Sequence, residues 1–227
     1  MVRINFAAEL QTAENGLVAE GSQVGQQLNR VMRALRERDP AIAATVIAND
    51  DRVDDIYLAT ETRILNLLAL QAPVAGDLRL VSAILHSNVH VERMGDLCVN
   101  IAKFVTNEHP YPPDSPMLAR LDDMGERAGE MLETAMTAFS RRDADLAEDL
   151  VEKDNALDRL NRGMLDELKQ YAGDEDSFEW AANLILVARY LERMGDHAVD
   201  IAEQIFFLVT GVRREFTDAS HPTALPS

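Results

Sequence analysis

Apolar residues recur at helical spacing along most of this 227-residue chain. Between residues 41 and 71, apolar side chains follow one another at intervals of four or seven positions, as in Ile42, Val46, Val53, Tyr57, Ile64 and Leu68. This is the periodicity of one face of an amphipathic α-helix. Prolines interrupt the pattern, above all in the segment NEHPYPPDSP at residues 107–116. We predict six long helices, at residues 5–37, 41–71, 75–106, 115–140, 143–172 and 176–211.

An internal repeat divides the chain in two. The segment ERMGDLCVNIA at residues 92–102 returns as ERMGDHAVDIA at residues 192–202, with eight of eleven residues identical. Upstream, VIANDDRVDDI at residues 46–56 aligns with LVEKDNALDRL at residues 150–160. Because short connections make consecutive helices antiparallel neighbours, we predict an all-α tandem repeat of two three-helix bundles. The predicted parts are a first bundle at 1–110, a second at 115–211 and a flexible C-terminal tail at 212–227.

Acidic residues four positions apart form the candidate site. Such residues share a helix face about 5–6 Å apart. The four pairs are Asp50 with Asp54, Glu92 with Asp96, Asp154 with Asp158, and Glu192 with Asp196. Facing rows of like charge repel one another, and a bound cation would neutralise them. Carboxylate oxygens suit hard or borderline metals such as Mg, Mn, Fe or Zn. The alternative is a solvated acidic face, but both copies of the repeat keep the acids.

Smaller features modify this picture. Gly95 and Gly195 lie inside the two ERMGD motifs, where a missing side chain would let a neighbouring helix or an ion approach. Glu61 extends the first acidic row, whereas its counterpart in the second half is Leu165, so we expect two non-identical sites. His86 and His90 have the spacing of zinc-binding histidines but no HExxH motif, and they point away from Glu92. We expect both histidines to face the surface or a partner.

Charge and composition restrict the class of protein. The chain has 39 acidic and 22 basic residues, a net charge of −17, which argues against binding to nucleic acid or to an anionic membrane surface. No apolar run approaches the ~18 residues of a membrane span, and no signal-peptide core is visible. The single cysteine, Cys98, excludes an internal disulfide, fits a reducing compartment and is expected in the core. We therefore expect a soluble, cytoplasmic protein.

The quoted motifs resemble those of the PhoU family of phosphate-transport regulators. INFAAEL at residues 4–10 is similar to the family's Phe-x-x-Glu-Leu start, and QAPVAGDLRLVSAIL at residues 71–85 to its Pro-Val-Ala-x-Asp-Leu-Arg segment. VARYLERMGDHAVDIAE at residues 187–203 resembles the second family signature. The resemblance covers nearly the whole chain. It implies two three-helix bundles related by pseudo-twofold symmetry.

The resemblance also implies a function. Family members are non-enzymatic adaptors that carry metal clusters on their carboxylate rows. When phosphate is plentiful, they help to repress the Pho regulon through a sensor histidine kinase and restrain the ATPase of the phosphate ABC transporter. By resemblance, the first metal site comprises Asp50, Asp54, Glu92 and Asp96, and the second Asp154, Asp158, Glu192 and Asp196. The metal is expected to be Fe, Zn, Mn or Mg, and the protein a homodimer.

This chain departs from the family pattern at three positions. Where the family often has Lys and Asp in the third helix, the chain has His86 and His90, which changes a face expected to contact partners. The usual Asn at the end of the second motif is Asp200, which would alter the metal preference of the second site.

Two other functions compete with the adaptor. A ferritin-like carboxylate enzyme would need Glu-x-x-His on two helices of one four-helix bundle, and the sequence contains no Glu-x-x-His. A purely structural helical scaffold would use its acids only for solubility. Metal analysis of the purified protein distinguishes the scaffold from the metal-binding adaptor. An oxidase assay distinguishes the enzyme from both.

Overall fold

The computed structural model describes residues 2–107, 115–173 and 175–216, and this part of the chain is helical without any β-strand. The elements are α1 (Val2–Glu37), α2 (Pro40–Ala48), α3 (Asp51–Gln71), α4 (Ala75–Thr106), α5 (Pro116–Arg141), α6 (Ala144–Leu168), the 3-10 helix η1 (Lys169–Tyr171) and α7 (Glu175–Thr210). The all-α prediction is confirmed. Residues 108–114 and most of the predicted tail lie outside the described residues.

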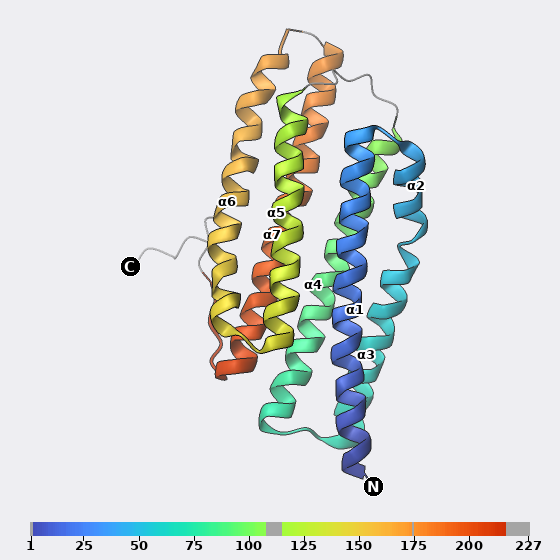
Figure 1. Cartoon of the computed structure of the whole chain (residues 1–227), viewed down its shortest axis with the longest axis vertical. Coiled ribbons are helices and arrows are strands. Elements are labelled where there is room, and N and C mark those ends of the chain that lie inside the picture. Colours follow the sequence, from blue (N-terminus) through green and yellow to red (C-terminus); the bar gives the residue numbers. More distant parts are fainter. Residues whose placement is uncertain (1, 108–114, 174, 217–227) are drawn as a thin grey trace, which may run out of the picture.

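Four long helices form the centre of the molecule. α1 packs against α4, α4 against α7, α7 against α5, and α5 back against α1 (Figure 1). α2 and α3 cover α1 and α4 on one side, and α6 covers α5 and α7 on the other. Each half is therefore a three-helix bundle, because α2 and α3 together correspond to α6. Equivalent helices meet across the boundary, α1 with α5 and α4 with α7, which is the expected pseudo-twofold arrangement.

The predicted helix at 41–71 is wrong in one respect, because it is interrupted. Asn49 and Asp50 form a turn between α2 and α3, and the Asn49 backbone has φ −100° and ψ 4°. The N–H groups of both residues bond to carbonyls three positions back, and the Asn49 side chain donates to the Thr45 carbonyl. Asn and Asp side chains compete with the backbone ladder in this way. The turn places Asp50 at the start of α3.

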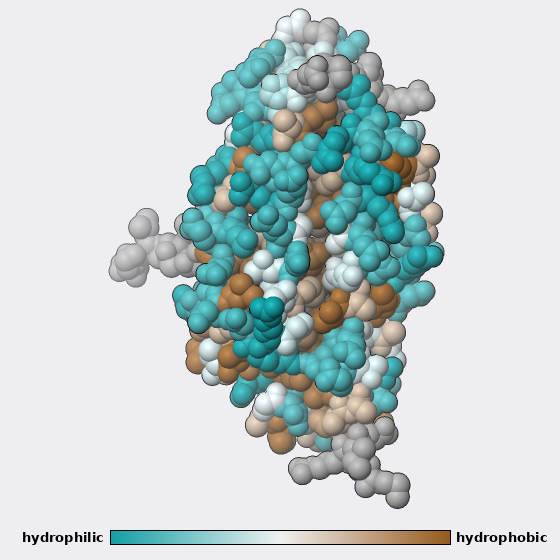
Figure 2. Space-filling model, viewed as in Figure 1, coloured by the Kyte–Doolittle hydropathy of each residue, from teal (hydrophilic) through white to brown (hydrophobic). Residues whose placement is uncertain are grey.

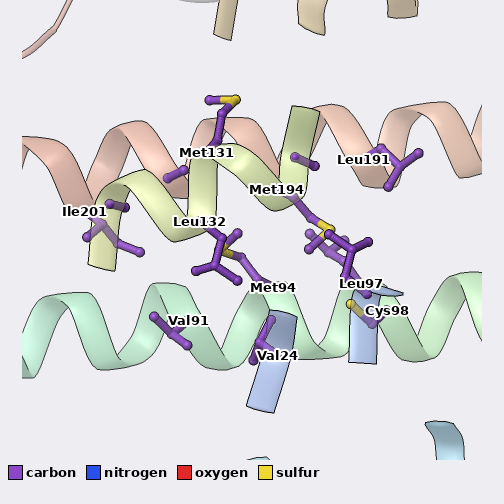
Figure 3. Packing of buried hydrophobic residues seen from close by; sticks show 14 of the residues in the cluster. Val24, Val91, Met94, Leu97, Cys98, Met131, Leu132, Leu191, Met194 and Ile201 are labelled. Atoms are coloured by element: carbon purple, nitrogen blue, oxygen red, sulfur yellow. The ribbon is translucent and has the colours of Figure 1, made fainter. Parts of the chain in front are cut away.

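The core lies where the four central helices meet. Met94, Leu97 and Cys98 of α4 face Leu191, Met194 and Ile201 of α7, with Val24, Met131 and Leu132 contributed by α1 and α5 (Figure 3). Met94 and Met194 are equivalent positions of the repeat, and both are fully buried. The expectation for Cys98 is confirmed, since its side chain is inaccessible. The repeat therefore contributes matching apolar faces to one continuous core.

The two bundles also meet along α1 and α5, and here the contact between them is more open than between α4 and α7. Gly21 and Gly25 of α1 and Gly125 and Gly129 of α5 line a groove of about 800 Å³ between these helices. Figure 2 shows this face, where a paler strip runs between hydrophilic surfaces. Across the described helices, no stretch is long and apolar enough to cross a membrane.

Candidate metal-binding sites

The first acidic site lies where α3 and α4 pack together. Asp50 and Asp54 face the motif residues Glu92 and Asp96 closely enough that their negative charges act on one another. Burial and the charges of Asp54 and Asp96 raise the pKa of Asp50, and the nearby Gln27 amide partly offsets this rise. Burial and the neighbouring Asp96 likewise raise the pKa of Glu92. The four predicted residues therefore lie in one neighbourhood, although they come from different helices. Asp54 is exposed, and Asp50, Glu92 and Asp96 are half-buried.

Glu20 of α1 is a fifth carboxylate that the sequence analysis missed. The side chain is 0 % exposed, and within the described part of the chain neither carboxylate oxygen has a hydrogen-bond partner. Burial, together with the charges of Glu92 and Asp54, raises the pKa of Glu20 to about 9. A buried carboxylate needs a proton, a cation or hydrogen bonds. Glu20 therefore lies against the acidic row, and both of its carboxylate oxygens are without a hydrogen bond in the described structure and could bind a metal ion.

A sequence signal for Glu20 does exist. α1 buries a stripe with spacings of three and four, in the order Leu17, Glu20, Val24, Gln27 and Val31. Polar residues at core positions of such a stripe break the binary pattern. Glu20 and Gln27 both do so, which marks the face of α1 that meets the site.

The second acidic site lies between α6 and α7. Asp154, Asp158 and Glu192 are buried, and Asp196 is half-buried. Burial and the neighbouring Asp196 raise the pKa of Glu192 to about 7. Arg189 donates to Glu192, and the Arg162 Nη1 atom lies 3.3 Å from the Asp158 carboxylate.

The two sites differ, as the sequence predicts. At the first site, Arg93 lies 3.5 Å from Glu92 and 3.1 Å from Asp96 and is itself exposed. The second site has Arg162 and Arg189 beside its acids, and the position equivalent to Glu20 is the buried Met124. Glu61 accepts a hydrogen bond from the Tyr57 hydroxyl, whereas its counterpart Leu165 is exposed. The first site therefore has more carboxylates and fewer nearby cations.

The carboxylate oxygens of both sites are suitable ligands for a cation. However, they do not lie close enough together for three of them to bind one ion. Among the described residues, the one group of three His, Cys, Asp or Glu ligand atoms within 4.8 Å of one another is His90, His197 and Asp200. The buried oxygens of Glu20 and the second oxygen of Glu192, which have no hydrogen-bond partner in the described structure, are the observations that fit an oxygen-binding metal.

The histidine expectation is half right. His86 is exposed on α4, as predicted. His90 is instead half-buried against His197 of α7, so the prediction that it faces the surface is wrong. The sequence could not reveal this contact, because it joins helices from the two halves of the chain.

These features define an all-helical protein of two related bundles, each with acidic residues buried between its helices. A family model described as the PhoU domain matches the chain twice, at residues 18–105 and 121–205, so both bundles are matched. The chain belongs to the PhoU family, and the resemblance read from the sequence is confirmed.

Individual relatives can be aligned with this chain over nearly its full length. The phosphate-specific transport system accessory protein PhoU homolog of Pseudomonas aeruginosa is 32% identical over 217 residues, which covers 95% of this chain and 88% of the relative. The accessory protein PhoU of Escherichia coli K12 is 30% identical over 207 residues, covering 91% and 86%. The crystal structure of PhoU from P. aeruginosa matches with a TM-score of 0.84 at 32% identity, over 91% of this chain and 100% of that one. The phosphate transport system regulatory protein PhoU from Streptococcus pneumoniae matches with a TM-score of 0.85 at 27% identity, covering 93% and 100%.

The pKa of Glu20 predicts how stability depends on pH. Its carboxyl keeps a proton up to pH about 9 in the folded state but loses it near 4.5 when unfolded. In EDTA, the free energy of unfolding should therefore fall as pH rises from 5 to 8. Glu20→Gln should reduce this slope by up to about 1.4 kcal/mol per pH unit. Urea denaturation at several pH values measures this dependence of the unfolding free energy on pH. The exposed Glu37→Gln on the same helix is the control, and equal slopes for Glu20→Gln and wild type would contradict the account.

The two motif glycines predict opposite effects of the same substitution. A Cβ atom at Gly195 would lie 2.6 Å from Asp154 Oδ1 and 2.8 Å from Leu157 Cδ2, so α6 approaches the motif as expected. Gly195→Ala should lower the free energy of unfolding by about 1–3 kcal/mol through overpacking. At Gly95 the nearest atom would be Val53 Cγ1 at 3.4 Å, an ordinary contact. Gly95→Ala should be neutral or stabilising by up to about 1 kcal/mol. Denaturation of both variants is the test, and equal losses would refute the difference.

Proposed function

We propose that this protein is a metal-binding regulator of phosphate uptake and phosphate signalling. The observation that carries the proposal is the membership of both halves in the PhoU family, whose relatives are named as accessory proteins of a phosphate-specific transport system. In phosphate-rich cells it would repress phosphate-starvation genes through a sensor histidine kinase. It would also restrain the ATPase of the phosphate transporter.

Two clusters of carboxylates, each with buried and more exposed members, support metal binding. Asp50, Asp54, Glu92 and Asp96, with Glu20 added from the structure, would hold one metal site. The second site would comprise Asp154, Asp158, Glu192 and Asp196. A divalent or trivalent ion would supply the positive charge that now has to come from protons or arginines. Hard oxygen donors favour Mg, Mn or Fe, with Zn also possible at carboxylates.

Surface charge supports an adaptor that works by contact. The second half of the sequence, residues 114–227, has 25 acidic and 12 basic residues and a net charge of −13. A face of this sign attracts a basic surface on a partner and guides its encounter. We propose that the kinase and the transporter ATPase are such partners, reached from the cytoplasm. The homodimer stays a prediction.

The ferritin-like enzyme is the weaker candidate. In that class, carboxylates and Glu-x-x-His motifs of four helices converge on one shared site. Here the acids divide into two sets, one on α1, α3 and α4 and the other on α6 and α7. The PhoU relatives are named for transport and regulation rather than for catalysis. We therefore propose no reaction.

Metal binding should raise thermal stability. A ligand that binds only the folded form adds about 2.7 kcal/mol at a hundredfold excess over Kd. Melting in EDTA and with added Mn²⁺, Mg²⁺ or Zn²⁺ measures the shift. Asp96→Asn and Asp196→Asn should each remove part of it, whereas Asp166→Asn at an exposed site on α6 should not. A melting temperature that no metal changes would exclude these sites as metal sites.

Deletion of the gene should leave phosphate-starvation genes switched on in phosphate-rich medium, because the proposed repressor is missing. The readout is a reporter driven by a phosphate-starvation promoter. Wild-type protein should restore repression, and the variant Glu92→Ala, Asp96→Ala, Glu192→Ala, Asp196→Ala should not, although it accumulates.

The control for this experiment is Asp166→Ala, which leaves both acidic sites intact. Normal repression in the deletion strain, with no second copy of the gene present, would reject the regulatory function. Full rescue by the quadruple variant would retain the adaptor but remove metal from its mechanism.

A further inference from the structure

Three side chains meet at the boundary between the two bundles, away from the acidic rows. His90 comes from α4, and His197 and Asp200 come from successive turns of α7. The His90 Nδ1 atom lies 3.2 Å from His197 Nδ1 and 3.3 Å from Asp200 Oδ2, and His197 Nδ1 lies 3.6 Å from the same oxygen. The three potential ligand atoms therefore form a nearly equilateral triangle.

The size of this triangle matches one face of a zinc coordination shell. Zinc binds His nitrogen at about 2.0–2.1 Å and carboxylate oxygen at about 2.0–2.2 Å, in tetrahedral geometry. Ligand atoms at those distances and tetrahedral angles are about 3.3–3.5 Å apart. The observed edges of 3.2, 3.3 and 3.6 Å lie close to this range. Among the described residues of the carboxylate rows, no three ligand atoms lie within 4.8 Å of one another.

The chemistry of the group favours a transition metal over a hydrogen-bonded cluster alone. Two neutral imidazole nitrogens that face each other can share only one proton, and both lone pairs are used when a cation lies between them. Two imidazoles with one carboxylate suit Zn²⁺. Imidazole nitrogen is a softer ligand than oxygen, so Mg²⁺ is not the preferred ion. Asp200 is 46% exposed, so a fourth position is open to water.

Among the residues that the structure describes, the group occurs once. Under the offset of 100 residues that relates the two motifs, His90 corresponds to Tyr190, His197 to Leu97 and Asp200 to Asn100. The twin position thus lacks nitrogen ligands from histidine. The group also uses none of the acidic residues assigned to the two carboxylate sites.

We propose that His90, His197 and Asp200 form a third metal site, which binds one Zn²⁺ ion and ties α4 of the first bundle to α7 of the second. The ion would have three protein ligands and one water. Since both bundles contribute ligands, its binding stabilises their mutual packing directly. The proposal does not depend on the phosphate function or on metal at the acidic rows.

Titration of the full chain with Zn²⁺ in millimolar Mg²⁺ tests this site, because Mg²⁺ occupies oxygen sites and leaves imidazoles free. Calorimetry should show a Zn²⁺-binding event whose Kd rises about tenfold or more in His90→Ala and in His197→Ala. His86→Ala, one turn away on the same helix and exposed, should bind like wild type. Circular dichroism and melting in EDTA establish that the variants fold.

Nitrogen-15 NMR of the five histidine rings identifies the ligands in the wild-type chain, independently of any variant. Stoichiometric Zn²⁺ should shift the ring nitrogens of His90 and His197, and Mg²⁺ should shift neither. Unmoved signals for His90 and His197, or equal Zn²⁺ affinity in wild type and both alanine variants, would overturn the site.

Discussion

Carboxylates that lie between packed helices must be neutralised, and this requirement explains most of what is unusual in the molecule. An unpaired buried charge costs several kcal/mol, so it persists only with a proton, a cation or hydrogen bonds. Glu20 and Glu192 both have raised pKa values, of about 9 and about 7. An apolar residue at either position would pack without that cost, as Met124 does at the position equivalent to Glu20.

The two halves meet the same requirement in different ways. The duplicated Glu and Asp positions of the ERMGD motifs are identical, yet Arg162 and Arg189 accompany the acids of the second site. The first site instead adds Glu20 and has one arginine, Arg93, beside Glu92 and Asp96. The second site therefore has two arginines beside its four acids, whereas the first has one arginine beside five. We infer that the first site has the greater requirement for an added cation.

Helical periodicity and the internal repeat were sufficient to predict the fold. Both depend on local spacing. The pseudo-twofold packing of α1 with α5 and of α4 with α7 was implied by the family resemblance and not by spacing. The break at Asn49 and Asp50 was missed, because apolar spacing continues across it while the backbone turns.

The site was only partly predictable for a related reason. Two acids four residues apart lie on the same face of one helix, and the sequence contains four such pairs in matching positions of the repeat. Glu20 stands alone in its stripe, so only its place among apolar residues indicates burial. The contact of His90 with His197 joins residues 107 positions apart and depends on how the bundles dock. Spacing within one helix contains no information about such a contact.

Anomalous diffraction from crystals grown with Mn²⁺ tests the central claim most directly, because it locates the cation itself. The account predicts anomalous density among Glu20, Asp54 and Glu92 between α1, α3 and α4, and a second peak beside Asp158 and Glu192. The absence of density at both acidic sites, in well-ordered crystals at pH 8, would contradict it and leave protons and arginines as the neutralising groups.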